Sequence, residues 1–175
     1  QTTPTDTQLE FFADYIVHLM SAQSSLPTHV SEQQGAIYRG IRVLLNPSLY
    51  SPGKHFTWQA FSSATKKQVA TLDFVQVLPG RLLLGALFVI HSITAKDICN
   101  FSAFPSEEEV LFPPNSQFKV DRVVTSVPEK AALLSELSAY DLTDLDVYVV
   151  MQGLVHHKKV LTKILNLGFS PGFSA

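Results

Sequence analysis

The sequence has very little cysteine: Cys99 is the only one in 175 residues. A disulfide within the chain is therefore impossible, and packing and hydrogen bonds must hold the fold. We interpret Cys99 as a packing residue rather than a nucleophile, because cysteine behaves as a small hydrophobic residue in protein interiors. No second cysteine and no His-Glu-x-x-His motif is available for zinc, so no metal site is expected.

Charged residues are also scarce. They make up 16% of the chain against 46% hydrophobic residues, and the formal net charge is −2. This composition excludes a disordered chain, and without a basic excess a nucleic-acid partner is not expected. The longest apolar run, residues 82–90, has the length of a buried strand and is too short for a membrane span. We expect one compact domain over residues 1–175, since a chain of this length can bury a core.

Two motifs that cradle phosphates, G-x-x-x-x-G-K and G-x-G-x-x-G, do not occur in the sequence. A dinucleotide would therefore have to bind outside the usual dinucleotide fold. A G-x-S-x-G string occurs at residues 168–172, but Pro171 follows the serine where a hydrolase would begin a helix. We do not interpret it as a nucleophile. The pair His156 and His157 is interpreted as part of a solvated helix face.

The hydrophobic periodicity predicts an α+β domain. Helices are expected over residues 6–24, 66–72, 94–100, 128–137 and 156–166, and strands over residues 36–44, 55–61, 81–91, 107–112, 117–127 and 145–152. The segment 81–91 is almost continuously apolar, which is typical of a central strand covered on both faces. Helices and strands do not alternate regularly, so the sheet is expected to be partly antiparallel.

The first candidate functional residue is an arginine in the strand expected at residues 36–44. Strand alternation places Arg39 on the same face as Ile41, which is expected to be buried, and Arg42 on the opposite, solvated face. A buried arginine must pair with a carboxylate or bind an anion, and its planar fork suits a pyrophosphate. Gly40 would allow a flat ligand to approach the backbone closely. The residues around Arg39 do not distinguish between these two interpretations, an ion pair and an anion-binding site.

Small hydroxyl side chains form the second candidate segment, Phe-Ser-Ser-Ala-Thr at residues 61–65. Hydroxyl groups of this kind can orient an acidic side chain by hydrogen bonding. They are equally common where an ordinary strand passes into a loop. The position of Ser63 and Thr65 therefore does not by itself distinguish a functional site from an ordinary end of a strand.

Three consecutive carboxylates form the third candidate segment, before an apolar strand and two prolines. In strand geometry Glu107 and Glu109 share one face, and Glu108 points to the other. Two like charges on one face of a strand repel each other. The alternative is an acidic loop that protects the end of the strand from edge-to-edge pairing.

Taken in order, Y-R-G, F-S-S-A-T and S-E-E-E-V-L-F-P-P resemble the arginine–serine–glutamate class of mono-ADP-ribosyltransferases, which ends in an E-x-E motif. The resemblance covers roughly residues 37–124 and departs from the usual Ser-Thr-Ser at Ser63-Ala64-Thr65. It implies an ADP-ribosyltransferase fold, in which split, mostly antiparallel sheets form an NAD cleft and an N-terminal helix packs against them. It also implies NAD as co-substrate, no metal, and a monomer.

The resemblance also implies roles for individual residues. Glu109 would hold the 2′-hydroxyl of the nicotinamide ribose, Ser63 would fix its rotamer, and Glu107 would receive the acceptor guanidinium. An acceptor protein would meet the loop Phe101–Glu109, where Phe101 and Phe104 either contact the target or anchor the loop. The expected catalytic residues are Glu109, Glu107, Ser63 and Arg39. The expected NAD-binding residues are Arg39, Gly40, Ser63, Thr65, Phe74 and Glu109.

The predicted function is transfer of ADP-ribose from NAD to an arginine side chain of a target protein. An NAD glycohydrolase, with water as acceptor, would use the same residues, although Glu107 favours transfer. An acceptor other than arginine is also open. A further alternative is a scaffold domain that binds NAD without turnover. The sequence argues against it, because such a domain would not need to keep all three of Arg39, Ser63 and Glu109.

Overall fold

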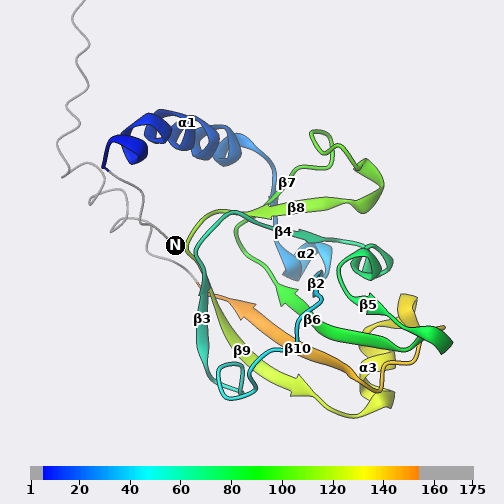
Figure 1. Ribbon diagram of the computed structural model, residues 1–175. Coiled ribbons are helices and arrows are strands. Elements are labelled where there is room, and N and C mark those ends of the chain that lie inside the picture. The colour runs from blue at the N-terminus through cyan, green and yellow to red at the C-terminus, as the bar shows by residue number, and fades with distance from the viewer. Residues whose placement is uncertain (1–5, 154–175) are drawn as a thin grey trace, which may run out of the picture.

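The computed structural model describes residues 6–153, which form one mixed sheet with a long N-terminal helix and several short helices around it (Figure 1). The helix predicted at residues 156–166 and the string at residues 168–172 lie outside the described residues. The helices are α1 (Asp6–Ser25), α2 (Ser31–Gln34) and α3 (Val127–Leu133), with 3-10 turns η1 (Gln68–Asp73), η2 (Pro79–Arg81), η3 (Pro105–Glu107) and η4 (Ser135–Leu137). The strands are β1 (Thr28–His29), β2 (Ile37–Ile41), β3 (His55–Trp58), β4 (Ser62–Thr65), β5 (Gln76–Val77), β6 (Leu83–His91), β7 (Ala95–Asp97), β8 (Glu109–Phe112), β9 (Ser116–Val124) and β10 (Leu145–Gln152).

The strands lie in the order β1-β7-β8-β4-β2-β6-β10-β9-β3. The short strand β5 is not part of this order and pairs with β6. Neighbouring strands are antiparallel except for β6 and β10, which run parallel with Leu145 opposite Gly85. The predicted α+β class with a mostly antiparallel sheet is therefore confirmed.

The central strand β6 is buried on both faces because its alternate side chains enter two separate cores. Phe88 and Ile90 pack into an aromatic core that includes Tyr148, whereas Leu87 and Val89 pack into an aliphatic core beside α3 and η4. The apolar run predicted to form a central strand therefore forms one, and it provides the rigid base from which β2 is positioned.

The sheet is split between β2 and β4. These strands meet at a single pair of residues, Tyr38 opposite Thr65, while β2 pairs with β6 along its whole length. One group of strands (β1, β7, β8, β4) therefore diverges from the other (β2, β6, β10, β9, β3), and the candidate site lies where they separate. The split sheet expected from the resemblance is present.

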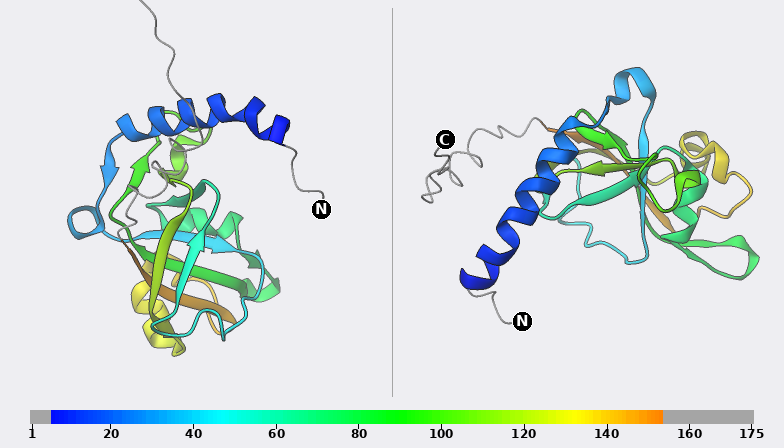
Figure 2. Two further views of the ribbon diagram at one scale, coloured as in Figure 1. Left: turned by 90° about the vertical axis from the view of Figure 1, so that its left-hand side faces the viewer. Right: turned by 90° about the horizontal axis from the view of Figure 1, so that it is seen from above.

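The N-terminal helix contacts the sheet through its C-terminal end and otherwise extends beyond it (Figure 2). The Gln23 side-chain amide donates to the Leu111 carbonyl at 3.0 Å, and the Lys96 ammonium donates to the Ser24 carbonyl at 3.2 Å. Further toward the N-terminus, Phe12 is 54% exposed and Ile16 is 43% exposed. The predicted helix is confirmed, but much of its apolar stripe faces outward. None of the helices in the described part of the chain combines the length and apolar character needed to cross a membrane.

One predicted helix is wrong. The sequence predicts a helical turn capped by Thr94 over residues 94–100, but β7 lies there, paired with β1 and β8. The Thr94 hydroxyl is engaged by the Gln152 side-chain amide instead, and the Thr94 backbone amide donates to Gln152 Oε1 at 3.0 Å. Strand pairing with distant segments therefore overrides the local capping preference.

The three predicted strands that border the candidate site are shorter than expected. The segment predicted at residues 36–44 pairs only as far as Ile41, which lies opposite Ala86. The segment predicted at residues 55–61 ends at Trp58, and the chain then leaves β9 to pair with β8 at Ser62. The strand predicted at residues 107–112 begins at Glu109, which alters how the three glutamates are presented.

Candidate active site

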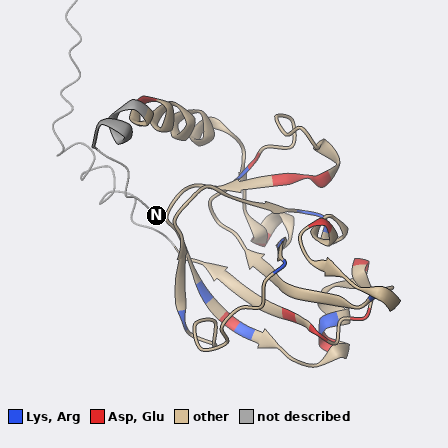
Figure 3. Ribbon diagram, viewed as in Figure 1, with Lys and Arg blue, Asp and Glu red and all other residues tan. Residues whose placement is uncertain are grey.

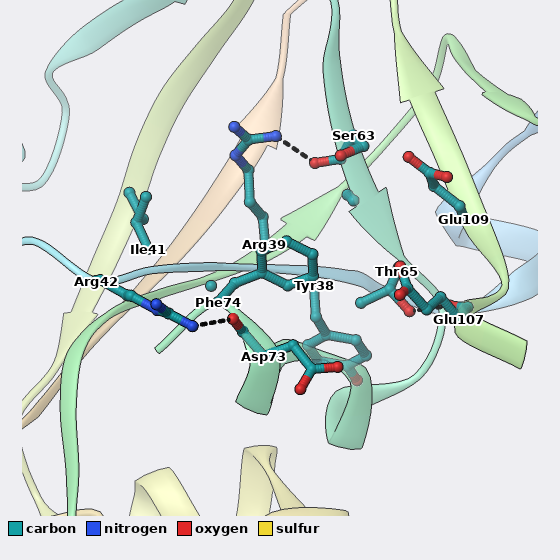
Figure 4. A pocket seen from close by; sticks show the side chains of 12 residues that line it. Tyr38, Arg39, Ile41, Arg42, Ser63, Thr65, Asp73, Phe74, Glu107 and Glu109 are labelled. Carbon is teal, nitrogen blue, oxygen red and sulfur yellow. Dashed lines mark hydrogen bonds between the residues drawn. The ribbon is translucent and has the colours of Figure 1, made fainter. Parts of the chain in front are cut away.

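A pocket of about 300 Å³ lies at the split between β2 and β4 (Figure 4). Its lining comes from β2 and the residue after it, from β4, from the end of η1, and from the acidic segment before β8. The lining residues are Tyr38, Arg39, Gly40, Ile41, Arg42, Ser63, Ala64, Thr65, Asp73, Phe74, Glu107 and Glu109. The fold thus brings together every residue that the sequence analysis assigned to catalysis or NAD binding.

Arg39 is half-buried without an acidic partner among the described residues. Its guanidinium lies 4.9 Å from the centre of the Trp58 ring, and its Nη1 donates to the Ser63 carbonyl (Figure 4). Burial lowers the pKa of Arg39 from its ordinary value, because a low-dielectric surrounding disfavours the charged form. Of the two interpretations, the pairing with a carboxylate is not observed. A desolvated guanidinium that contacts only a carbonyl and an aromatic ring retains donors for an anion.

Gly40 allows the chain itself to pack tightly against β2. A Cβ placed on Gly40 would lie 2.8 Å from the Thr71 carbonyl oxygen, 3.1 Å from a methyl of Val75 and 3.2 Å from the Phe74 Cβ. The sequence analysis expected a ligand to approach the Gly40 backbone closely. In the structure the segment that contains Phe74 also packs closely against Gly40, and this places Phe74 at the pocket wall.

We expect Gly40→Ala to lower the free energy of unfolding by about 1–3 kcal/mol, because the added methyl must displace backbone at residue 71. The shift would move the Phe74 wall and weaken NAD binding as well. Urea denaturation checks the first effect. Gly153→Ala is the matched control, since its added Cβ would come no closer than 3.8 Å to the Gln117 carbonyl. Equal stability of the two variants would contradict the assigned role.

The strand register places Ser63 and Glu109 on the same face. Ser63 lies opposite Leu111, and Thr65 lies opposite Glu109 in the β4–β8 pair. Directly opposite residues of antiparallel strands point to the same side of a sheet, so Ser63 and Glu109 are diagonal neighbours at the pocket. Ala64 and Val110 point the other way into the core. Alternation along two short strands therefore aims one hydroxyl and one carboxylate at the same space.

Glu107 and Glu109 both line the pocket, but strand alternation is not the reason. Glu107 ends the 3-10 turn η3, and only Glu109 belongs to β8. Between them Glu108 has the left-handed conformation, with φ 50°, which is uncommon for a residue other than glycine. This residue turns the chain so that the carboxylates on either side of it face the same cavity. The predicted shared orientation is confirmed, and its predicted cause is wrong.

The acidic segment is fastened to the end of β4 by several contacts. The Thr65 hydroxyl donates to the Glu107 carbonyl, and the Lys66 amide donates to the Glu108 carbonyl at 3.2 Å. The Lys67 ammonium lies 3.0 Å from a carboxylate oxygen of Glu108. Thr65 therefore lines the pocket, but in this structure its hydroxyl holds the loop. Lys67 was not identified from the sequence, where it is one of two adjacent surface lysines.

The carboxylate of Glu109 is held by a residue that the sequence analysis missed. Ser102 donates to Glu109 Oε2 at 2.9 Å, whereas no hydrogen bond joins the Ser63 hydroxyl to Glu109 in the described structure. The Glu109 carbonyl accepts from the Ile98 amide at 3.1 Å. Ser102 precedes Glu109 by seven residues in an irregular loop, and no sequence periodicity indicates a contact across such a loop.

An ion pair supports the backbone beside Glu109. Lys66 Nζ lies 2.9 Å from Asp97 Oδ2, and the Cys99 amide donates to Asp97 Oδ1 at 3.0 Å. Partial burial by itself raises the pKa of Asp97, but hydrogen bonds from Cys99 and Lys66 outweigh it and lower the pKa to about 2 from an ordinary 3.8. Cys99 is half-buried, and its thiol lies 3.6 Å from the Glu109 carbonyl.

This lowered pKa predicts an acid-sensitive contribution to stability. The ionised form of Asp97 is favoured in the folded state, so its contribution is fully present above about pH 4 and is lost as the pH falls through about 2. We expect Asp97→Asn to lower the free energy of unfolding by about 1 kcal/mol at pH 7, allowing for solvent screening of a partly exposed pair. Denaturation at about pH 7 and about pH 2.5 measures the difference, which should shrink at the lower pH.

Asp121→Asn serves as control, because that carboxylate is 52% exposed on β9. A difference between wild type and Asp97→Asn that is the same at both pH values would contradict the assignment.

Arg42 contributes to the pocket although strand alternation placed it on the opposite face. Because β2 ends at Ile41, alternation no longer governs the next residue. The Arg42 side chain is exposed, as expected, and Nη2 donates to the Asp73 carbonyl at 2.8 Å (Figure 4). Phe74, 46% exposed, lines the same pocket as the sequence analysis expected.

The pocket has two arginines on one side and two glutamates on the other, with Asp73 next to Arg42. Arg39 and Arg42 project from β2 and the residue after it. Glu107 ends η3 and Glu109 begins β8, where acidic residues gather in Figure 3. No group of His, Cys, Asp or Glu within the described ranges could hold a metal ion. Such a separation of charge suits a ligand with an anionic centre and, at a distance, a cationic one.

The sequence profile of the family described as NAD:arginine ADP-ribosyltransferase matches residues 10–138, which include all the pocket residues. The chain belongs to this family. A chicken (Gallus gallus) NAD(P)(+)–arginine ADP-ribosyltransferase 1 is 34% identical over 48% of the chain and 24% of its own length. The mouse (Mus musculus) GPI-linked NAD(P)(+)–arginine ADP-ribosyltransferase 1 is 33% identical over 58% of the chain and 29% of its own length. The chain thus spans less than a third of either relative.

Solved structures confirm the ADP-ribosyltransferase fold. The ATR domain of Salmonella SpvB superposes with a TM-score of 0.64 at 19% identity, covering 87% of this chain and 77% of that one. The Vis toxin of Vibrio splendidus, an ADP-ribosyltransferase, gives a TM-score of 0.59 at 24% identity over 89% of this chain and 64% of that one. Vis has also been solved in complex with agmatine, with a TM-score of 0.59.

Proposed function

We propose that this chain is the catalytic domain of a mono-ADP-ribosyltransferase that cleaves the nicotinamide–ribose bond of NAD and transfers ADP-ribose to an arginine side chain. The observation that carries the proposal is the pocket at the split sheet, with an uncompensated Arg39 on one side and Glu107 and Glu109 on the other. Family membership supports the co-substrate, and the charge arrangement supports the chemistry.

NAD matches this arrangement in charge. Its pyrophosphate is anionic and suits the free guanidinium donors of Arg39, whereas its nicotinamide ring carries a positive charge. Cleavage of the N-glycosidic bond passes through an oxocarbenium-like transition state, as in glycoside hydrolysis. Glu109 would bind the ribose 2′-hydroxyl and stabilise that developing positive charge. The Gly40 backbone would bind the carboxamide, and Phe74 would bound the ring.

Arginine as acceptor follows from the second carboxylate. A guanidinium has a pKa above about 12 and is a poor nucleophile unless a carboxylate receives its proton. Glu107 lines the same pocket as Glu109 and would supply that function. Support also comes from Vis, which has been solved with agmatine, a small guanidine.

The acceptor protein would bind at the loop Phe101–Glu109. Phe101 is 75% exposed and Phe104 is 65% exposed, and large exposed aromatic side chains close to an active site are typical of recognition surfaces. The alternative, in which both rings anchor the loop by burial, does not fit these exposures. The loop therefore supports transfer to a protein rather than hydrolysis alone.

The test is a paired assay of nicotinamide release from NAD with and without agmatine, using wild type and Glu109→Ala. We expect release by wild type to rise with agmatine and to yield ADP-ribosyl-agmatine, and Glu109→Ala to be nearly inactive. Release that is indifferent to agmatine and yields only free ADP-ribose would favour the glycohydrolase. If neither protein released nicotinamide but NAD still raised the melting temperature, an NAD-binding scaffold without activity would be favoured.

A further inference from the structure

The loop that carries the two exposed phenylalanines is connected to the catalytic carboxylate through one hydroxyl group. Ser102 Oγ donates to Glu109 Oε2 at 2.9 Å and accepts from the Phe104 amide at 3.1 Å. The Ser102 hydroxyl therefore uses its hydrogen and one of its two acceptor lone pairs in these two hydrogen bonds. Ser102 is itself half-buried, whereas Phe101 and Phe104 on either side of it in the sequence are exposed.

The two ends of this loop are held in different ways. The end at residues 107–108 is fastened to β4 by Thr65 and Lys67 through the backbone of Glu107 and the side chain of Glu108. These contacts fix the path of the chain but do not touch the Glu109 carboxylate. Within the described residues, Ser102 is the side chain that forms a hydrogen bond with this carboxylate.

The geometry points to Ser102 as a positioning residue for Glu109. A hydrogen bond to a carboxylate is stronger than one between neutral groups, and it restricts a side chain that would otherwise populate several rotamers. Held in this way, the Glu109 carboxylate is aimed before NAD enters, and Ser63 is free to contact the substrate. This inference rests on the proposed function of Glu109 and extends it to a residue outside the arginine–serine–glutamate motif.

The kinetic test compares kcat and KM for NAD in wild type, Ser102→Ala, Ser102→Thr and Ser138→Ala, each with and without agmatine. We expect Ser102→Ala to lower kcat about tenfold, as for loss of a hydrogen bond to a charged group, with KM for NAD unchanged within about twofold. The loss should be equal with and without agmatine, because both reactions begin with the same bond cleavage. Ser102→Thr keeps a hydroxyl and should recover most of kcat.

Ser138→Ala is the control. Ser138 is exposed, lies outside both the pocket and the loop Phe101–Glu109, and its side chain makes no hydrogen bond to any described residue, so its removal should leave kcat and KM as in wild type. Wild-type kcat for Ser102→Ala would overturn the inference. So would a loss confined to the agmatine reaction, or a loss that Ser102→Thr fails to recover and that is accompanied by a lower melting temperature.

A second measurement does not depend on turnover. With 13C-labelled glutamate, the carboxyl-carbon signal of Glu109, assigned through Glu109→Gln, should move in Ser102→Ala and stay in place in Ser138→Ala. An unmoved signal would overturn the inference. Absence of nicotinamide release by wild type would instead count against the proposed function, so the two failures are distinguishable.

Discussion

Glu109→Gln is expected to lower the kcat of nicotinamide release by about 10³-fold, with and without agmatine. Removing one stabilising group from a preorganised site typically costs a factor of this size, and glutamine keeps the shape of the side chain while removing its charge. Ser102 can still donate to the amide oxygen, so the local structure should persist. NAD should therefore still bind and raise the melting temperature of the variant.

Glu107→Gln provides the internal comparison. It removes a carboxylate from the same pocket, but one assigned to the acceptor rather than to the ribose. We expect transfer to agmatine to fall at least tenfold while release without agmatine changes less than about threefold, in line with loss of a general base. If Glu107→Gln modified agmatine as well as wild type, the acceptor role of Glu107 would be wrong. If Glu109→Gln retained wild-type release, the catalytic assignment itself would be wrong.

Arg39→Lys is expected to raise the KM for NAD by about 30-fold, because lysine keeps the positive charge but loses the bidentate geometry. The structure adds a second reason. The guanidinium both lies over Trp58 and donates to the Ser63 carbonyl, so the planar group is fixed before the pyrophosphate arrives. An ammonium cannot reproduce both contacts, and part of the binding free energy would be used to order it.

The matching control is Arg122→Lys on the outer surface of β9, where Arg122 pairs with Asp121 and Glu129. It should leave KM and kcat unchanged. The stabilisation of each variant by NAD in a thermal melt gives an independent measure of affinity. An Arg39→Lys variant stabilised by NAD to the same extent as wild type would remove Arg39 from the binding site.

Much of the candidate site could be identified from the sequence because three short segments occur in a recognisable order. An arginine in an apolar strand and three carboxylates before another strand are unusual, but each segment alone left a structural alternative open. Their order, which resembles the arginine–serine–glutamate class, indicated Arg39, Ser63, Glu107 and Glu109, and the fold brings these residues into one pocket. Long apolar segments were equally informative, and the strand predicted at residues 145–152 has the predicted bounds.

The failures arose where long-range contacts decide the conformation. Thr94 can cap a helix in an isolated peptide, but in the folded chain its backbone and side chain are bound by Gln152, and strand β7 forms instead. The shared orientation of Glu107 and Glu109 was predicted from strand alternation, whereas it depends on the left-handed Glu108 and on the contact of that residue with Lys67.

By itself, the sequence determined the α+β class, the family, and the charged groups available to the chemistry, because these depend on residue type and order. Only the tertiary structure decided which donor holds the Glu109 carboxylate, which groups fix the Arg39 guanidinium, and why Gly40 has no side chain. Each of these depends on atoms brought within about 3–5 Å by strand pairing and loop closure. Spacing along the chain constrains such distances within a helix or strand, but not across the split between β2 and β4 or through the loop from Phe101 to Glu109.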